Sequence, residues 1–249
     1  MTGKEVALFG IKISQLGLAE TANLVTESVL SRKGLKVYCC TLNELMAADE
    51  DEDFKKILIK GDLRTADGMP LVWMLRRKTG EGGRVYGPDL MKLVLEKTLR
   101  KDIKHYFLGD KKNRHRLIYQ LKKMYSGINI AGYEVLPIRN IFLEKDYGKI
   151  NQKLEDSGAS LVWVGLGGKK QIMVADELSR RFSDKVFITV GAAFDFLAKT
   201  KKQAPIWTQK IGLEWFFRLV TEPKRLGTRY LKILIFLGKK LFENRNGGN

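Results

Sequence analysis

One carboxylate, that of Asp67, lies at the end of a predicted strand, where α/β proteins commonly have their active sites. Asp67 follows a short strand-like stretch, and Pro70 opens the apolar run that comes next, which predicts a helix over 70–78 capped near Met69. Ligands of open α/β sheets collect at the carboxyl ends of strands, and proline is favoured in the first turn of a helix. Asp67 could therefore act as a general base. An aspartate before a glycine is also common as a cap or turn residue, so this stretch alone leaves both roles open.

Several other predicted strands also end in small or polar residues. If the strands are parallel, these ends share one edge of the sheet, where backbone N–H groups and helix N-termini can bind phosphate. We infer a nucleotide site at this edge, although strand-to-helix turns also use glycine for structural reasons. The Gly165 stretch matches neither a Walker loop nor the full dinucleotide fingerprint. The strand ends are Thr41-Leu42-Asn43, Asp67-Gly68, Gly109-Asp110, Gly165-Leu166-Gly167 and Gly191-Ala192-Ala193-Phe194-Asp195.

The chain offers few other groups for catalysis. Its two histidines, His105 and His115, are ten residues apart, and no cluster has the spacing of metal ligands, so we expect no metal site. Neighbours in a strand point to opposite faces, so Cys39 and Cys40 are not expected to pair, which favours a reduced, cytosolic setting. Arginines, including Arg84, would then have to balance the charge of any departing nucleotide diphosphate.

The order of the elements predicts the fold. Strand-like runs alternate with helix-like runs of ten or more residues, which indicates a Rossmann-like α/β fold with a largely parallel sheet and helices on both faces. We place the catalytic core at residues 1–206, which could comprise two subdomains, and a basic amphipathic helical appendage at 207–249. Asp89 is expected to cap a helix running to about Lys101. Strands are expected over 6–9, 36–41, 63–66, 103–108, 128–135, 160–164 and 186–190, and further helices over 18–30, 112–125, 146–156 and 170–182.

The charge of the chain indicates an acidic partner. Lys and Arg number 45 against 28 Asp and Glu, a net charge of +17, which suits nucleic acid, anionic lipid or a phosphorylated substrate. From Trp207 onward nine basic residues and three acidic ones are interleaved with seven aromatic residues. On a helix over 226–243 the charges fall within an arc of about 120°, with Phe236 alone among them. This pattern suits a helix in a membrane interface, or one packed on its own domain or a second subunit. No apolar run approaches the ~20 residues that a transmembrane helix needs.

A set of short motifs follows in a fixed order along the chain: Thr41-Leu-Asn43, Thr65-Ala-Asp67-Gly68-Met69, Arg84-Val-Tyr-Gly87-Pro-Asp89-Leu-Met91, Phe107-Leu-Gly109, Val164-Gly-Leu-Gly167, Gly191-Ala-Ala-Phe-Asp195, Ala204-Pro-x-Trp207, Gly212-Leu-Glu-Trp215-Phe-Phe-Arg218 and Glu222-Pro-Lys-Arg225-Leu-x-x-Arg229. Taken in this order, the motifs resemble those of the bacterial WecG/TagA/CpsF glycosyltransferases. The resemblance departs at Lys169 and Ile172, where the family has proline and glutamate around a lysine and Gln171, and at Lys199 and Gln203, where it has glycine and arginine.

The resemblance implies an inverting, metal-independent transferase without a cofactor. It would move a hexose or N-acetylhexosamine, of N-acetylmannosamine type, from a UDP-sugar to N-acetylglucosamine on undecaprenyl diphosphate. The alternative donors are glucose and N-acetylmannosaminuronic acid, and the pathways are those of teichoic acid, exopolysaccharide or common antigen. Such an enzyme would be cytoplasmic and peripheral on the inner face of the anionic membrane, and a homo-oligomer stays open. A nucleic-acid-binding α/β protein is the distant alternative; we expect no nucleic acid, because the aromatic–basic mixture is amphipathic rather than a stacking groove.

The resemblance also assigns roles to residues. It implies that Asp67 is the general base and that Thr41 lies in the same catalytic pocket; one base suffices for a one-step inverting displacement. Arg218, Arg225 and Arg229 of the appendage are expected to contact the diphosphate or the membrane. The residues expected to bind substrate are Asn43, Gly68, Arg84, Gly109, Gly165, Gly167, Gln171, Gly191 and Asp195.

Overall fold

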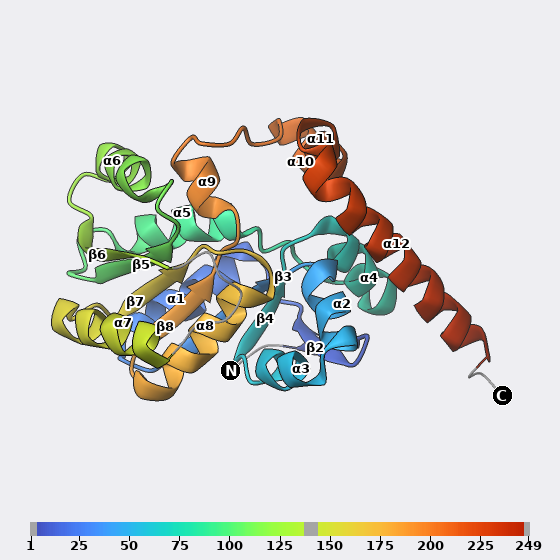
Figure 1. The fold of residues 1–249 in the computed structure, drawn as a ribbon, viewed down its shortest axis with the longest axis horizontal. Coiled ribbons are helices and arrows are strands. Elements are labelled where there is room, and N and C mark those ends of the chain that lie inside the picture. The colour runs from blue at the N-terminus through green and yellow to red at the C-terminus, as the bar shows by residue number, and fades with distance from the viewer. Residues whose placement is uncertain (1–3, 137–143, 247–249) are drawn as a thin grey trace.

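A computed structural model describes residues 4–136 and 144–246 of the chain. An eight-stranded sheet forms its centre, in the order β1-β2-β4-β3-β8-β7-β5-β6. Every neighbouring pair is parallel except β1 and β2, which confirms the predicted α/β class (Figure 1). The strands are β1 (Glu5–Leu8), β2 (Ile11–Ser14), β3 (Leu35–Cys40), β4 (Leu63–Ala66), β5 (Lys104–Gly109), β6 (Asn129–Val135), β7 (Leu161–Val164) and β8 (Val186–Thr189).

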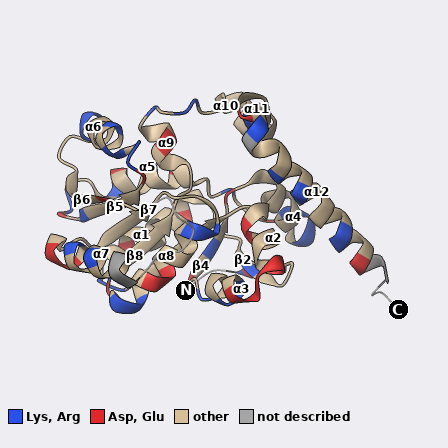
Figure 2. Ribbon diagram, in the orientation of Figure 1, with Lys and Arg blue, Asp and Glu red and all other residues tan. Residues whose placement is uncertain are grey.

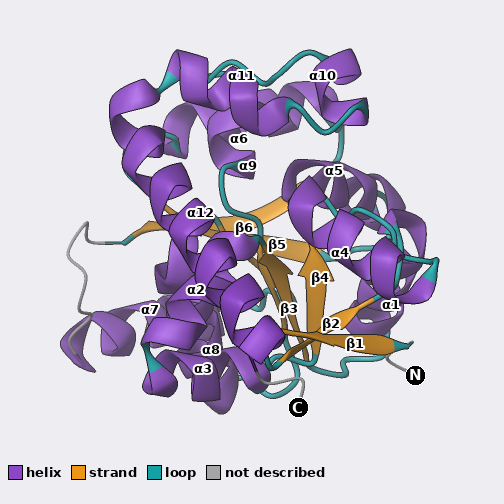
Figure 3. Cartoon of the chain, turned by 90° about the vertical axis from the view of Figure 1, so that its right-hand side faces the viewer, coloured by secondary structure: helices purple, strands orange, loops and turns teal. Residues whose placement is uncertain are grey.

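Helices cover both faces of the sheet (Figure 3). One face carries α1 (Leu18–Leu30), α5 (Gly87–Thr98), α6 (Arg114–Met124) and α9 (Ala193–Leu197). The other carries α2 (Leu42–Glu50), α3 (Glu52–Ile59), α7 (Glu144–Ser157) and α8 (Gly168–Arg181), and α4 (Met69–Thr79) packs into the same core beside β1 and β4. The remaining helices, α10 (Ile206–Lys210), α11 (Glu214–Thr221) and α12 (Pro223–Asn246), follow the last strand.

Strand β3 shows how the sequence separates the two cores. Val37 and Cys39 pack with the helices of one face, whereas Tyr38 and Cys40 pack with those of the other, as the two-residue period of a strand requires. Both cysteines are buried and free, and they lie on opposite faces as predicted. All four residues are hydrophobic because a parallel sheet is covered on both sides.

The parallel pairing gathers the polar strand ends at one edge. Cys40 lies opposite Ala66 at the ends of β3 and β4, and Val164 lies opposite Leu108 and Thr189 at the ends of β5, β7 and β8. The turns that follow these strands therefore line the carboxyl edge of the sheet, as the sequence predicted.

Two local predictions were wrong or incomplete. Strand β2 was not predicted; it returns from β1 through a tight turn in which Phe9 and Gly10 have φ values of 51° and 76°. Asp89 does not cap α5, which begins at Gly87 with Tyr86 as its N-cap residue. Pro88 is compatible with a helix only in its first turn, so the helix begins just before it and Asp89 lies inside the helix. The free N–H of Gly87 donates to the Asp67 carboxylate at 2.8 Å, in place of a cap by Asp89. Asp67 is thus a cap after all, but of a helix that starts twenty residues later.

The appendage crosses one side of the molecule, where α12 lies against α2 (Figures 1 and 3). Phe236 is buried and meets the Phe9 ring edge-on, with centroids 5.0 Å apart, and Lys240 pairs with Asp49 at 2.7 Å. Lys and Arg recur along α12, and acidic residues gather where α2 meets α3 (Figure 2). Part of the wide apolar side of α12 stays uncovered, with exposed Leu231, Leu234, Ile235, Leu241 and Phe242, whereas Ile233 and Leu237 pack against the core.

The interpretation that this helix packs on its own domain is confirmed. The interpretation of the helix as one lying in a membrane interface stays a prediction; the helix also presents exposed apolar residues outward. The one apolar residue that falls among the charges, Phe236, is the anchor. No helix within residues 4–136 and 144–246 combines the length and apolar character needed to cross a bilayer. The domain boundary at residue 206 stays a prediction.

Replacing the anchor should release α12. Phe236→Ala removes the ring that packs against Phe9, and we expect the docked state of α12 to lose about 2 kcal/mol, or roughly thirtyfold in its population. Limited proteolysis should then cut within α12 correspondingly faster. Phe242→Ala is the matched control because its ring is 66% exposed; equal protection of both variants would show that Phe236 does not anchor the helix.

Candidate active site

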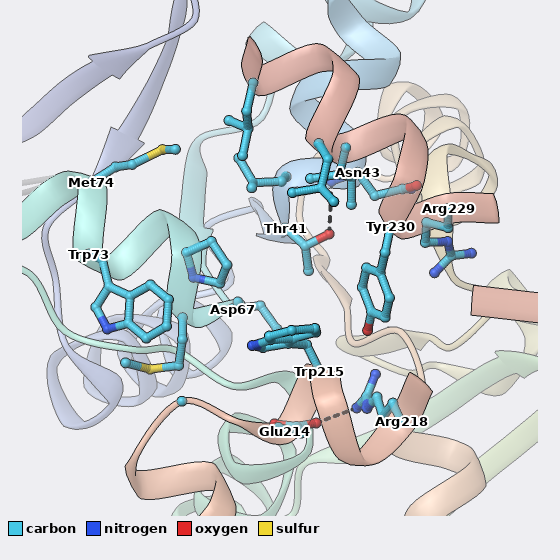
Figure 4. A pocket seen from close by; sticks show the side chains of 18 of the residues that line it. Thr41, Asn43, Asp67, Trp73, Met74, Glu214, Trp215, Arg218, Arg229 and Tyr230 are labelled. Carbon is cyan, nitrogen blue, oxygen red and sulfur yellow. Dashed lines mark hydrogen bonds and ion pairs between the residues drawn. The ribbon is translucent and has the colours of Figure 1, made fainter. Parts of the chain in front are cut away.

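A cavity of about 560 Å³ opens at the carboxyl edge of β3 and β4 (Figure 4). The turns after the two strands form its polar side, α4 forms one apolar wall, and α11 and α12 close it from the appendage. Segments that are far apart in the sequence thus share one site. The predicted residues that line it are Thr41, Asn43, Asp67, Gly68, Arg84, Arg218 and Arg229.

Asp67 is held from both sides. Its backbone N–H donates to the Cys40 carbonyl at 2.9 Å, which continues the pairing of β3 and β4, and its Oδ2 accepts the Gly87 N–H. Arg84 Nε donates to the Asp67 carbonyl at 2.7 Å. Oδ1 has no hydrogen-bond partner among the described residues. The hydrogen bond to Oδ2 therefore positions the carboxylate, and Oδ1 is available to bind a ligand.

The environment of Asp67 suits a base that works near neutral pH. Burial raises the pKa of Asp67 to about 6, and the Arg84 guanidinium, the Gly87 N–H and Arg218 oppose a larger rise. A general base is most effective when its pKa lies near the working pH, because it is then both deprotonated and strong enough to take a proton. Perturbed carboxylates in cavities are typical of functional sites.

Thr41 and Asn43 approach the same cavity through the start of α2. Thr41 is the N-cap residue: its Oγ1 accepts the Asn43 N–H at 3.2 Å and donates to Glu44 Oε2 at 2.7 Å, and its own N–H donates to Glu44. This is a capping box, and it occupies the Thr41 hydroxyl. Gly68, the N-cap residue of α4, lies next to Thr41. A catalytic role for Thr41 stays a prediction.

The appendage contributes a buried carboxylate that the sequence analysis did not single out. Glu214, 6% exposed, accepts from Arg84 at 2.5 Å, from Arg218 at 2.6 Å and from the Tyr86 hydroxyl at 2.8 Å. Burial acts to raise the pKa of Glu214, but Arg218 and Arg84 outweigh it and hold that pKa below its ordinary value. The signal was present in the motif Gly212-Leu-Glu-Trp215, although nothing there indicated its partners. Figure 4 shows Glu214 and Arg218 side by side below Trp215.

Of the two other predicted arginines of the appendage, only Arg229 can be placed in the site. Arg229 lies on α12 beside Tyr230 and lines the cavity (Figure 4). The side chain of Arg225 lies outside the part of the chain that the structure describes, so its predicted contact stays untested. The apolar lining was also missed by the sequence analysis; it comes from α4 and the appendage and includes Trp73, Met74, Trp215, Ile233 and Leu237.

The remaining predicted residues lie at the same edge of the sheet but do not line this cavity. Gln171 Oε1 accepts the N–H groups of Gly167 at 3.2 Å and Gly191 at 2.9 Å, and so joins the turns after β7 and β8. A Cβ atom at Gly109 or Gly165 would overlap the Phe194 ring.

Asp195 is engaged in a separate polar cluster. It accepts from the Asn113 amide at 3.0 Å and pairs with Lys201 at 3.1 Å. These contacts, and those of Gly109, Gly165 and Gln171, are structural reasons for the residue types. A role of this group in substrate binding stays a prediction. Within residues 4–136 and 144–246, no three His, Cys, Asp or Glu side chains gather closely enough to hold a metal ion.

The fold and the cavity define a Rossmann-like α/β protein with a carboxylate at the carboxyl edge of its sheet and a helical C-terminal cover. The sequence model of the glycosyl transferase WecG/TagA/CpsF family matches residues 6–248, nearly the whole chain. The chain belongs to this family, which confirms the resemblance. It is a glycosyltransferase of cell-surface polysaccharide synthesis, with a sugar donor and an acceptor as its substrates.

Proposed function

We propose that this enzyme transfers an N-acetylhexosamine, of N-acetylmannosamine type, from a UDP-sugar to N-acetylglucosamine carried on a polyprenyl diphosphate, with inversion and without a metal. The observation that carries the proposal is Asp67, a carboxylate in the cavity with a pKa near 6, whose Oδ2 accepts the Gly87 N–H and whose Oδ1 has no hydrogen-bond partner among the described residues. Family membership supplies the class of reaction.

The reaction follows from this one carboxylate. Ionised Asp67 takes the proton of the acceptor hydroxyl as that oxygen attacks the anomeric carbon of the donor. The carbon–oxygen bond to UDP breaks on the opposite face, and the electron pair leaves with the diphosphate. Arg218 and Arg229 are the cations that line the cavity from the appendage, and they would balance the charge that develops on the leaving group.

The form of the cavity supports an amphiphilic acceptor. The lining combines polar and cationic side chains, such as Asp67, Arg84 and Arg218, with apolar ones, Trp73 and Met74 on α4 and Ile233 and Leu237 on α12. A sugar diphosphate would contact the polar group and the start of an isoprenoid chain the apolar group. The exposed apolar side of α12 supports a peripheral location on the inner face of the anionic membrane, where such an acceptor would be met.

The turns joined by Gln171 are proposed to contact the donor nucleotide. Gly167 and Gly191 both have positive φ values, 72° and 56°, so the chain turns sharply at the carboxyl edge of the sheet after β7 and β8, where a nucleotide can approach the backbone. The core over 1–206 would thus bind the donor, and the appendage over 207–249 would complete the acceptor side.

A screen of UDP-sugars against a lipid-linked N-acetylglucosamine acceptor tests the proposal. We expect UDP release that depends on the acceptor, and a product heavier by one N-acetylhexosamine residue. A mass increase of a hexose or of a uronic acid would instead identify the glucosyl or N-acetylmannosaminuronosyl alternative. Absence of any product with all the donors would contradict the proposal.

A further inference from the structure

Behind Asp67, the appendage and the core meet through one buried acidic side chain. Glu214 is on α11, and its two oxygens together receive Arg84, Arg218 and the Tyr86 hydroxyl. Arg218 also donates to the Tyr86 oxygen at 3.1 Å. A buried carboxylate is tolerated only when charge-assisted hydrogen bonds replace its water, and here three donors do so.

Arg84 connects this carboxylate to the candidate base. Its Nε binds the Asp67 carbonyl at 2.7 Å, its Nη2 binds Glu214, and its guanidinium stacks over the Tyr86 ring at 4.2 Å. Three residues later the same segment delivers the Gly87 N–H to Asp67 Oδ2. The segment 84–87 thus contacts Asp67 at two points, and Glu214 accepts hydrogen bonds from two side chains of this segment, those of Arg84 and Tyr86.

We propose that Glu214 is a positioning residue for the reaction: it fixes the segment 84–87 on Asp67, and its negative charge compensates the two guanidiniums that flank the base. The inference rests on the proposed role of Asp67. Glu214 itself does not contact the Asp67 side chain, so it acts through Arg84, Arg218 and Tyr86.

The balance of charge around Asp67 gives the proposal a measurable consequence. The Glu214 carboxylate raises the pKa of Asp67, whereas Arg84 and Arg218 lower it. In Glu214→Gln the shape is kept and the negative charge is lost, so both cations act on Asp67 uncompensated. The base then becomes weaker. The ionisable groups that line the cavity with Asp67, or that interact electrostatically with it or with Cys39 next to it, are Cys39 and Cys40 on β3, Glu44 on α2, Arg77 on α4, Arg84 and Tyr86 before α5, Glu214 and Arg218 on α11, and Arg229 on α12.

The test is a titration of the full-length protein labelled with ¹³C at the aspartate carboxyl carbon. The Asp67 resonance is assigned by its loss in Asp67→Asn. We expect its midpoint, near pH 6 in the unmodified protein, to fall by about half a unit to one unit in Glu214→Gln. The acid limb of the pH–rate profile of sugar transfer should move by the same amount. Glu177→Gln is the matched control, because Glu177 pairs with Arg180 at 3.0 Å on α8 and lies on no segment that touches Asp67.

A second variant keeps the proposal open to refutation if Glu214→Gln does not fold. Arg84→Gln removes one of the two cations, so the midpoint of Asp67 should rise rather than fall. A midpoint that stays unchanged in the folded variants would overturn the proposal and leave Glu214 as a contact that only docks α11. The titration does not depend on turnover, so its outcome is separate from a failure to find any donor sugar.

Discussion

Asp67→Asn should abolish sugar transfer and yet stabilise the protein. Asparagine has the same shape and can still accept the Gly87 N–H, but it cannot take a proton from the acceptor, so we expect kcat to fall by roughly a thousandfold. Burial raises the pKa of Asp67 to about 6, from 3.8. Between these values the folded state binds more protons than the unfolded state, so Asp67 lowers stability as the pH rises through this window. Above pH 6 the buried, ionised Asp67 side chain lowers the free energy of unfolding, and asparagine removes this cost.

Thermal unfolding at two pH values measures this effect. At pH 7.5 we expect Asp67→Asn to be more stable by about 1–2 kcal/mol, less than the full pKa shift implies because solvent partly reaches the carboxylate. Near pH 4 the difference should vanish. Asp89→Asn provides the control, since the Asp89 side chain is 42% exposed and pairs only loosely with Lys92, at 3.8 Å. Full activity in folded Asp67→Asn would remove Asp67 as the base.

Ile235→Ser combined with Phe242→Ser should weaken binding to anionic vesicles by at least about a hundredfold. These side chains are 64% and 66% exposed on the outward side of α12. Each would contribute roughly 2 kcal/mol if the bilayer interface buried it, and serine contributes almost nothing. Neither change alters the net charge, so electrostatic attraction to the vesicles stays the same.

A matched pair of substitutions on the far face of the sheet separates membrane contact from general surface hydrophobicity. Leu30 on α1 and Tyr119 on α6 are 51% and 63% exposed, and Leu30→Ser with Tyr119→Ser should leave vesicle sedimentation unchanged. Equal sedimentation of the α12 variant and the unmodified protein would mean that this side of the helix meets another surface.

The part of the site that was predictable depends on local rules. Thr41 and Asp67 were placed together because parallel strands bring their carboxyl ends to one edge, and that edge follows from the alternation of strands and helices. Arg84 follows no strand, and only the family resemblance placed it in the site. The first turn of α4 was recognisable from Pro70. The two-residue period of a strand likewise predicted that Cys39 and Cys40 do not pair with each other.

The rest depends on contacts that no local pattern encodes. Tyr86 and Arg84 reach Glu214 across about 130 residues, and only the folded chain shows that this carboxylate stands behind the base. The helical wheel of α12 located Phe236 among charges but could not indicate that Phe236 packs against Phe9. Glycines at Gly109 and Gly165 suggested a phosphate site, whereas the structure adds the ring of Phe194 as a second reason for their small size.

The configuration of the new glycosidic bond tests the central claim, a single displacement assisted by Asp67, most directly. UDP-sugars of this type carry an α linkage, so NMR of the anomeric carbon in the lipid-linked product distinguishes the two outcomes. We expect a β linkage in the product of the unmodified enzyme, because one base and one displacement invert the carbon. An α linkage would contradict it, since retention requires a second displacement and a different use of the carboxylate.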